Sequence, residues 1–318
     1  MSTLEQKSAN QGCHLRVNIG GLELKNPIMP ASGAFGESME KVLDFNHLGA
    51  VLPKSITKYP RKGNDTPRVC EVPAGMINSI GIQSKGLQYY LKNIVPYYQQ
   101  YDTPLIASIS ADSVEEFVEM ADILGNNPGV DALELNISCP NLKGDGLAFG
   151  MDADVTYELT KKVRGITDVP LFNKLTPNVT RIQDIALASE EGGADALTVV
   201  NTFLAMSINV HTWKPELGNV MGGISGPGVK PIIVRMIYQV YQASKLPIIG
   251  CGGVMNGEDA IEMMLAGASA VQVGTASFIK PAAMLDVLEE IKSYMQQYGI
   301  NDIYDIIGKV HFNQYEEG

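Results

Sequence analysis

The 318-residue chain has few cysteines, and they lie far apart in the sequence. It has four, at Cys13, Cys70, Cys139 and Cys251, and no two of them form a Cys-x-x-Cys pair. Structural zinc sites and iron–sulfur clusters need several thiolates at short spacing, so the sequence predicts neither, and we expect no metal site. Dispersed cysteines fit a reducing compartment, and we therefore expect a cytoplasmic protein.

The chain also lacks long apolar runs and an excess of basic residues. No apolar run approaches the length that spans a bilayer. Residues 1–12 are polar and lack the apolar core of an export signal, and we expect them to form a flexible tail. The formal net charge is −11, whereas a nucleic-acid-binding surface is basic. We therefore expect neither a membrane nor a nucleic acid as partner, although a few lysines could still line a pocket for a small anion.

A dinucleotide-binding fingerprint is missing as well. No strand-like segment is followed by an intact Gly-x-Gly-x-x-Gly motif, and the nearest matches, at residues 250–253 and 144–146, have the wrong spacing. This argues against a doubly wound Rossmann-type sheet, which is the main alternative among the α/β folds.

What the chain does contain is a repeated unit of helix, glycine and short strand. Each glycine ends a helix, and the apolar run after it has the length of a strand. Such strands are expected at 49–52, 129–135, 193–200 and 267–273. Three other strands begin at a proline, at 104–107, 170–174 and 247–250, and the first strand of the series is expected at 27–32. Helical periodicity occurs at 113–125, 152–166, 181–191, 230–243 and 258–266. Eight strands mostly alternating with helices predict parallel β/α units closed into a (β/α)8 TIM barrel.

Some segments lie outside this repeat. A β-hairpin centred on Gly20-Gly21 is expected at 17–25, and a short helix at 37–47. The segments 55–85 and 202–228 exceed the usual length of loops, and we expect them to cover the C-terminal mouth of the barrel. Neither resembles a linker, so the sequence predicts a single domain over residues 1–318.

The segment 133–141 begins as an alternating strand and ends as a polar turn that contains Pro140. It places Cys139 just beyond a strand end, with Asn136 and Asn141 on either side. A thiol loses its proton at about pH 8.5, close enough to neutrality to act as a base or nucleophile. A lone cysteine is more often a small buried hydrophobic residue, so the other strand ends must decide between the two interpretations.

Active sites of TIM barrels lie at the C-terminal ends of the strands. Those ends carry polar residues whose joint presence on one rim favours a site: Ser32, Lys54, Ser108, Asn136, Lys174, Asn201 and Thr202. Gly252-Gly253 and Gly274-Thr275 end the last two strands, where such barrels commonly bind phosphate. The sequence thus predicts a ligand with a phosphate group, and flavin mononucleotide (FMN) and a sugar phosphate fit this pattern nearly equally well.

Several short motifs follow one another along nearly the whole chain: Lys54-Ser55-Ile56-Thr57, Asn78-Ser79-Ile80-Gly81-Ile82-Gln83, Asn136-Ile137-Ser138-Cys139-Pro140-Asn141, Lys174-Leu175-Thr176-Pro177-Asn178, Asn201-Thr202, Gly223-Ile224-Ser225-Gly226-Pro227, Gly252-Gly253-Val254 and Val273-Gly274-Thr275. With these motifs in this order, the chain resembles the class 1 dihydroorotate dehydrogenases. The resemblance implies an FMN-containing TIM-barrel oxidoreductase that oxidises dihydroorotate to orotate in de novo pyrimidine (UMP) biosynthesis.

The resemblance also implies roles for individual residues. Cys139 would be the catalytic base that removes the proton, while the hydride passes to FMN. Residues implied in cofactor binding are Ser32, Lys54, Ser55, Ser108, Asn136, Lys174, Val200, Gly226, Gly252, Gly253, Gly274 and Thr275. Residues implied in substrate binding are Lys54, Asn78, Ser79, Ile80, Gly81, Ile82, Asn136, Asn141, Asn201 and Thr202. The chain departs from the family pattern at Ser108, where Asn is usual, and at Ser84 and Cys251.

Within the family, the segments 73–76, 81–83 and 147–150 are similar to the NAD-linked branch, class 1B. This similarity implies a catalytic subunit that passes electrons to NAD through a separate subunit bearing FAD and an iron–sulfur cluster. A homodimeric core, and a heterotetramer with that subunit, would follow.

Three alternatives remain at this point. The first is the self-sufficient branch of the same family, which uses fumarate as electron acceptor. The second is an aldolase-like barrel in which Lys174 forms a Schiff base with the substrate. The third is a barrel that serves only as a binding or scaffold protein.

Overall fold

The computed structural model describes residues 13–138 and 149–311. The predicted residues Cys139 and Asn141 and the predicted tail 1–12 lie outside this part of the chain. Among the described residues, seven parallel strands form one curled sheet in the order β3-β15-β14-β9-β8-β7-β6. These strands are β3 (Ile28–Pro30), β6 (Ile106–Ile109), β7 (Ala132–Asn136), β8 (Leu171–Lys174), β9 (Ala196–Val199), β14 (Ile248–Cys251) and β15 (Ala268–Val273).

The eighth position of the barrel is filled by residues 49–56, which join the two edge strands. Gly49 N donates to the Ile28 carbonyl oxygen at 2.8 Å, and parallel bridges pair Val51 with Leu105 and Ile56 with Ile109. The prediction of a (β/α)8 TIM barrel is thus confirmed, with the expected strand at 49–52 present as bridges instead of a continuous ladder. The ladder is interrupted where Pro53, which has no backbone N–H, occupies the next donor position.

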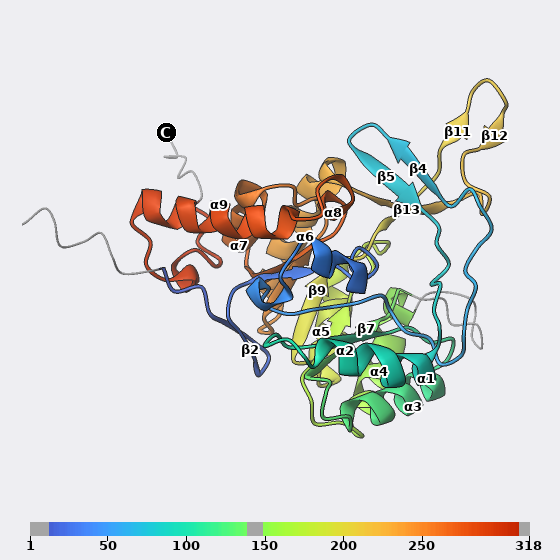
Figure 1. The fold of residues 1–318 in the computed structure, drawn as a ribbon, viewed down its shortest axis with the longest axis horizontal. Coiled ribbons are helices and arrows are strands. Elements are labelled where there is room, and N and C mark those ends of the chain that lie inside the picture. The colour runs from blue at the N-terminus through green and yellow to red at the C-terminus, as the bar shows by residue number, and fades with distance from the viewer. Residues whose placement is uncertain (1–12, 139–148, 312–318) are drawn as a thin grey trace, which may run out of the picture.

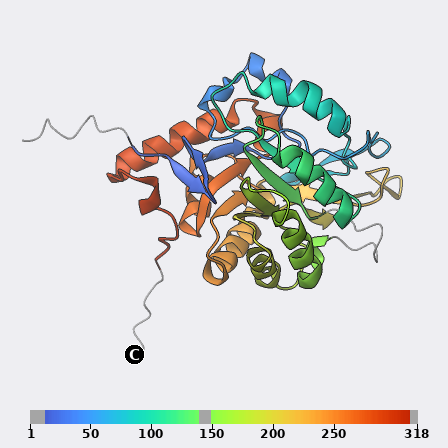
Figure 2. The same cartoon turned by 90° about the horizontal axis from the view of Figure 1, so that it is seen from below.

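Helices surround the strands, as the view from below shows (Figure 2). Their bounds are α3 (Val114–Gly125), α4 (Ala153–Arg164), α5 (Ile182–Glu191), α6 (Lys230–Ala243), α7 (Gly257–Leu265) and α9 (Ala283–Tyr298), with the shorter α1 (Leu87–Tyr89), α2 (Val95–Tyr98) and α8 (Ala276–Ile279). The π-helical turn η3 (Tyr90–Ile94) joins α1 to α2, and the 3-10 turns are η1 (Glu37–Lys41), η2 (Phe45–His47), η4 (Phe149–Met151), η5 (Pro227–Val229) and η6 (Ile303–Asp305). The five predicted helices are present within one or two residues of their expected ends, and the expected helix at 37–47 is two 3-10 turns.

Side-chain caps explain where several of these helices begin. Ser113 and Asp152 accept hydrogen bonds from the backbone N–H of Glu116 and Val155 at the starts of α3 and α4. Asn256 begins α7 with a reciprocal capping box, in which Asp259 bonds back to the Asn256 backbone. Such caps satisfy N–H groups that have no partner within the helix, so each of them fixes a helix start.

The two long segments 55–85 and 202–228 form a second, antiparallel sheet. It has the order β10-β13-β5-β4 and consists of β4 (Val69–Val72), β5 (Gly75–Asn78), β10 (Phe203–Ala205) and β13 (Gly222–Ser225). A two-stranded extension, β11 (Ile208–Asn209) and β12 (Lys214–Pro215), projects beyond it (Figure 1). The sequence predicted these segments as long loops only, so their pairing is a finding of the structure.

The predicted N-terminal hairpin is present as β1 (Val17–Ile19) and β2 (Leu22–Leu24). Its turn lies against the start of β9: a Cβ atom on Gly20, whose φ is +57°, would stand 2.4 Å from the Asp195 carbonyl oxygen. The hairpin therefore lies near the N-terminal ends of the strands, away from the mouth. Among the described residues, no helix combines the length and apolar character needed to cross a membrane.

Leu133 on β7 is fully buried, whereas Leu187 on α5 is 38% exposed. We expect Leu133→Ala to lower the free energy of unfolding by about 2–5 kcal/mol, because it removes buried methyl groups and leaves a cavity. Leu187→Ala is the matched control and should change it by less than about 0.5 kcal/mol. Urea unfolding of both variants tests the assignment of the core, and equal losses would contradict it.

Candidate active site at the mouth of the barrel

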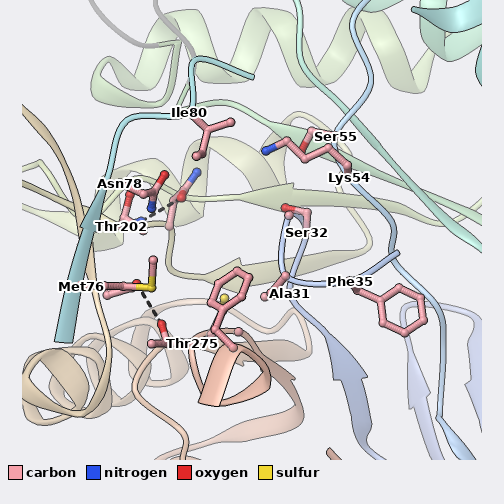
Figure 3. A pocket seen from close by; sticks show the side chains of 18 of the residues that line it. Ala31, Ser32, Phe35, Lys54, Ser55, Met76, Asn78, Ile80, Thr202 and Thr275 are labelled. Carbon is pink, nitrogen blue, oxygen red and sulfur yellow. Dashed lines mark hydrogen bonds between the residues drawn. The ribbon is translucent and has the colours of Figure 1, made fainter. Parts of the chain in front are cut away.

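A cavity of about 1160 Å³ lies between the carboxyl ends of the barrel strands and the antiparallel sheet. From the barrel it is lined by Ser32, Lys54, Ser55, Lys174, Val200, Asn201, Cys251, Gly252, Gly274 and Thr275, and from the antiparallel sheet and adjoining segments by Met76, Asn78, Ile80, Thr202 and Ser225. Figure 3 shows Asn78 and Thr202 side by side, with Lys54 and Ser55 across from them and Thr275 on a third side. The two sheets thus enclose one site.

Most of the residues predicted from the sequence lie on this cavity. Of the predicted cofactor residues, the lining includes Ser32, Lys54, Ser55, Lys174, Val200, Gly252, Gly274 and Thr275. Of the predicted substrate residues it includes Lys54, Asn78, Ile80, Asn201 and Thr202. The other predicted residues within the described part of the chain do not line the cavity themselves, but each is adjacent in sequence or hydrogen-bonded to a residue that does. They are Ser79, Gly81, Ile82, Ser108, Asn136, Gly226 and Gly253.

Amide side chains form a connected group on one side of the cavity. Asn201 Nδ2 donates to Asn136 Oδ1 at 3.0 Å, so Asn136 supports a lining residue from behind. Asn78 Nδ2 donates to the Gly223 carbonyl oxygen at 3.4 Å, which ties β5 to β13. Each amide offers a donor and an acceptor, so the group can bind a ring of alternating N–H and C=O groups.

A third side of the cavity is rich in glycine and hydroxyl groups. Gly252 and Gly253 have φ values of +118° and +83°, a backbone region that residues with a Cβ rarely adopt. Thr275, which lies between β15 and α8, shares a hydrogen bond of 2.9 Å with Ser225 Oγ of β13. Backbone N–H groups and hydroxyls at such an edge suit a phosphate group.

A buried polar network lies inside the barrel next to Lys174. Glu134 of β7 accepts hydrogen bonds from Thr198 Oγ1 at 2.9 Å and from Gln272 Nε2 at 2.7 Å. Lys174 Nζ donates to Gln272 Oε1 at 2.8 Å and lies 3.9 Å from Glu134 Oε1. Strands β7 and β15 are not neighbours in the sheet, so the Glu134–Gln272 bond crosses the interior of the barrel.

The charges in this network affect one another. Burial acts to lower the pKa of Lys174, but the neighbouring Cys251 sulfur and the Glu134 carboxylate outweigh it and hold that pKa above its ordinary value. Burial raises the pKa of the Cys251 thiol, so Cys251 acts on Lys174 as a charge only where the thiol ionises at alkaline pH, and at neutral pH the charge that faces Lys174 is the Glu134 carboxylate. Lys174 therefore presents a positive charge at the cavity wall.

Ser108, which replaces the usual Asn of the family pattern, is part of the same network. It is 1% exposed, shares a hydrogen bond of 2.9 Å with Ser55 Oγ and donates to Glu134 Oε1 at 3.4 Å. Its hydroxyl thus supports Ser55, which lines the cavity, and Glu134.

Glu134 and Gln272 were not predicted as site residues. A signal was present for Glu134, because a single charge between Leu133 and Leu135 is unusual in a strand that is buried on both faces. Its partner Gln272 is 138 residues further along the chain, and no pattern in the sequence connects the two. Within residues 13–138 and 149–311, no group of three His, Cys, Asp or Glu residues is arranged to hold a metal ion.

Comparisons with known proteins match almost the whole chain. A family profile described as dihydroorotate dehydrogenase matches residues 14–295. Proteins named dihydroorotate dehydrogenase B (NAD(+)), catalytic subunit, are similar over nearly their full lengths. The protein from Alkaliphilus metalliredigens is 49% identical over 93% of this chain and 99% of its own. The protein from Geobacillus sp. is 50% identical over 93% of this chain and 95% of its own. The protein from Desulforamulus reducens is 47% identical over 94% of this chain and 99% of its own.

The backbone at Gly253 provides a test of the cavity edge. A Cβ atom there would lie 2.6 Å from Lys230 Cβ and 2.9 Å from Lys230 Cα, at a φ of +83°. We expect Gly253→Ala to lower the free energy of unfolding by about 1–3 kcal/mol, because the strained backbone has no way to relax. Gly36→Ala is the control, since a Cβ atom on Gly36 meets nothing within 4 Å. Thermal unfolding of both variants measures the difference, and an unchanged melting temperature for Gly253→Ala would refute the close approach.

Proposed function

The chain belongs to the dihydroorotate dehydrogenase family, and from this we propose that it is the catalytic subunit of an NAD-linked enzyme that oxidises dihydroorotate to orotate in de novo pyrimidine synthesis. The observation that carries the proposal is the 47–50% identity, over nearly full length, to proteins named for this activity. The cavity supports it, because the residues predicted to bind cofactor and substrate line one space from two sides. We also propose that residues 1–318 form one catalytic domain and that the protein is located in the cytoplasm.

A flavin is the cofactor that the family implies, and we propose FMN. The cavity of about 1160 Å³ exceeds the roughly 300–1,000 Å³ of pockets for one small ligand, so it has room for FMN beside a small substrate. Gly252, Gly274 and Thr275 would hold the phosphate, while Ser32, Ser55, Lys174 and Val200 would contact the rest of the cofactor. Bound FMN would accept the hydride from the substrate. The buried positive charge of Lys174 suits a ring that gains negative charge on reduction.

The substrate would lie against the amide side of the cavity. Asn78, Asn201 and Thr202 would bond its ring N–H and C=O groups, and Lys54, on the opposite side (Figure 3), would pair with its carboxylate. Asn136 would hold Asn201 in place through their hydrogen bond of 3.0 Å. The proposal assigns Cys139 as the base that removes the proton adjacent to a ring carbonyl, and Asn141 as a further substrate contact.

Electrons must leave the reduced cofactor, and we propose that a separate subunit accepts them. The relatives are named catalytic subunits, which supports the existence of such a partner. We propose that the partner carries FAD and an iron–sulfur cluster, and that two catalytic chains form the core of a heterotetramer. This chain has no intact dinucleotide fingerprint and no clustered cysteines for these tasks.

The role of Cys139 is tested by Cys139→Ser. We expect the purified parent to show flavin absorbance that dihydroorotate bleaches, and the variant to bleach about two to four orders of magnitude more slowly at neutral pH, because a hydroxyl is a much weaker base. The variant's rate should rise at alkaline pH. Stopped-flow absorbance measures these rates, with Cys13→Ser as a control distant from the cavity. A parent without flavin, or one that dihydroorotate does not bleach, would refute the proposed function.

The path of the electrons is tested by steady-state assays with three acceptors in parallel. We expect the isolated chain to oxidise dihydroorotate rapidly with an artificial dye and slowly with NAD, and co-expression with the partner subunit to restore NAD reduction. Rapid turnover with fumarate would instead assign the chain to the self-sufficient branch. Rapid turnover of the isolated chain with NAD would exclude the need for a partner.

A further inference from the structure

Glu134 is a fully buried carboxylate that the proposed chemistry does not use directly. We infer that Glu134, acting through Gln272, is a positioning residue that holds the Lys174 ammonium in place against bound FMN. The inference rests on the proposed function, because it assumes FMN as the ligand beside Lys174.

The geometry links the three residues in one chain of bonds. Gln272 Nε2 donates to Glu134 Oε2 at 2.7 Å, and Gln272 Oε1 accepts from Lys174 Nζ at 2.8 Å. The amide thus turns its N–H toward the negative charge and its C=O toward the positive charge. The reverse orientation would place donors on the ammonium and an acceptor on the carboxylate, so the two charges fix the amide, and the amide fixes Lys174.

Lys174 is the member of this chain that reaches the cavity. It is 3% exposed and lines the cavity wall, whereas Glu134 and Gln272 are fully buried behind it. An ammonium has three N–H donors; one is used by Gln272, which does not line the cavity, and a second by Cys251, which leaves the third for a ligand. The side chain is therefore held from behind and can donate forward to a ligand.

Packing alone does not require this arrangement. A buried ion pair contributes little net stability, and apolar residues of similar volume often replace such a pair without loss. Removing one partner, however, leaves an unpaired buried charge. Because Lys174 of this pair lines a binding cavity, the effect of the pair on a ligand explains its presence better than its effect on folding.

The neighbours of Lys174 determine what happens when Glu134 loses its charge. In the described part of the chain, the titratable groups that act on Lys174 are Glu134 and Cys251, and Cys251 is a neutral thiol because its burial raises its pKa. The other contacts, Gln272 and the nearby Thr198, carry no charge. Glu134→Gln would therefore leave a buried lysine without a counter-charge, and the pKa of Lys174 would fall. Lys174 would be charged below that lowered pKa and neutral above it.

The test measures FMN affinity, not turnover. Apoprotein of the parent, Glu134→Gln, Lys174→Met and the double variant is titrated with FMN by fluorescence quenching at several pH values between about 6 and 9. We expect Glu134→Gln to weaken FMN binding on the order of tenfold at the alkaline end and much less at the acid end, relative to the parent at each pH. In the Lys174→Met background, Glu134→Gln should cause no further loss.

A matched control separates positioning from stability. Thr198→Val removes one hydrogen bond to Glu134 and keeps both charges. We expect it to lower the melting temperature while FMN affinity keeps the pH profile of the parent. If Glu134→Gln does not fold, Gln272→Leu serves in its place, because it breaks the link and keeps both charges. It should weaken FMN binding severalfold at all pH values, and only when Lys174 is present.

Two results would overturn the inference. The first is that the double variant loses FMN affinity by the sum of the two single losses, that of Lys174→Met and that of Glu134→Gln (or of Gln272→Leu in its place). The second is that the pH profile of Glu134→Gln runs parallel to that of the parent. Either result would leave the proposed function intact. Failure of the parent itself to bind FMN would overturn the proposed cofactor together with this inference.

Discussion

The barrel depends on the short segment that closes it. Residues 49–56 accept and donate the backbone hydrogen bonds that join β3 to β6, and without them the sheet would have two open edges. Pro53 interrupts this pairing, and Lys54 and Ser55 follow immediately at the cavity wall. The same residues that close the barrel therefore place two side chains of the site. Ser55 is then tied to β6 by its bond of 2.9 Å to Ser108.

Closure also creates the interior in which Glu134 and Lys174 meet. Parallel strands place side chains of paired residues on the same face of the sheet, so Ser108, Glu134, Lys174 and Thr198 all point inward. Several of these groups lie on strands that are not neighbours in the sheet, and only the closed barrel brings them near enough to bond with one another across its axis. The result is a polar layer that costs desolvation and in return presents one oriented positive charge to the cavity.

The sequence predicted the barrel and five of its helices because these features are local, and the strand ends together with the family resemblance predicted several residues that line the cavity. Glycines end helices, and Ser113, Asp152 and Asn256 begin them, each through contacts within a few residues. The antiparallel sheet was not predicted, because its strands are short and β5 pairs with β13 across 145 residues, as at Asn78 and Gly223. The helical stretch from α1 to α2 and the long helix α9 were also missed. Glu134 could be noticed from the sequence, but its function depends on Gln272, which only the closed barrel brings near.

The site consists of two parts that the fold builds separately. The barrel contributes the charge of Lys174 and the glycine edge, whose geometry is rigid because the strands are hydrogen-bonded on both sides. The antiparallel sheet contributes Asn78 and lies over the mouth, held to the barrel by the Ser225–Thr275 hydrogen bond of 2.9 Å. That bond joins the edge assigned to the phosphate to the sheet assigned to the substrate. Binding of the cofactor against Thr275 would therefore also stabilise the position of β13, and through it the substrate side of the cavity.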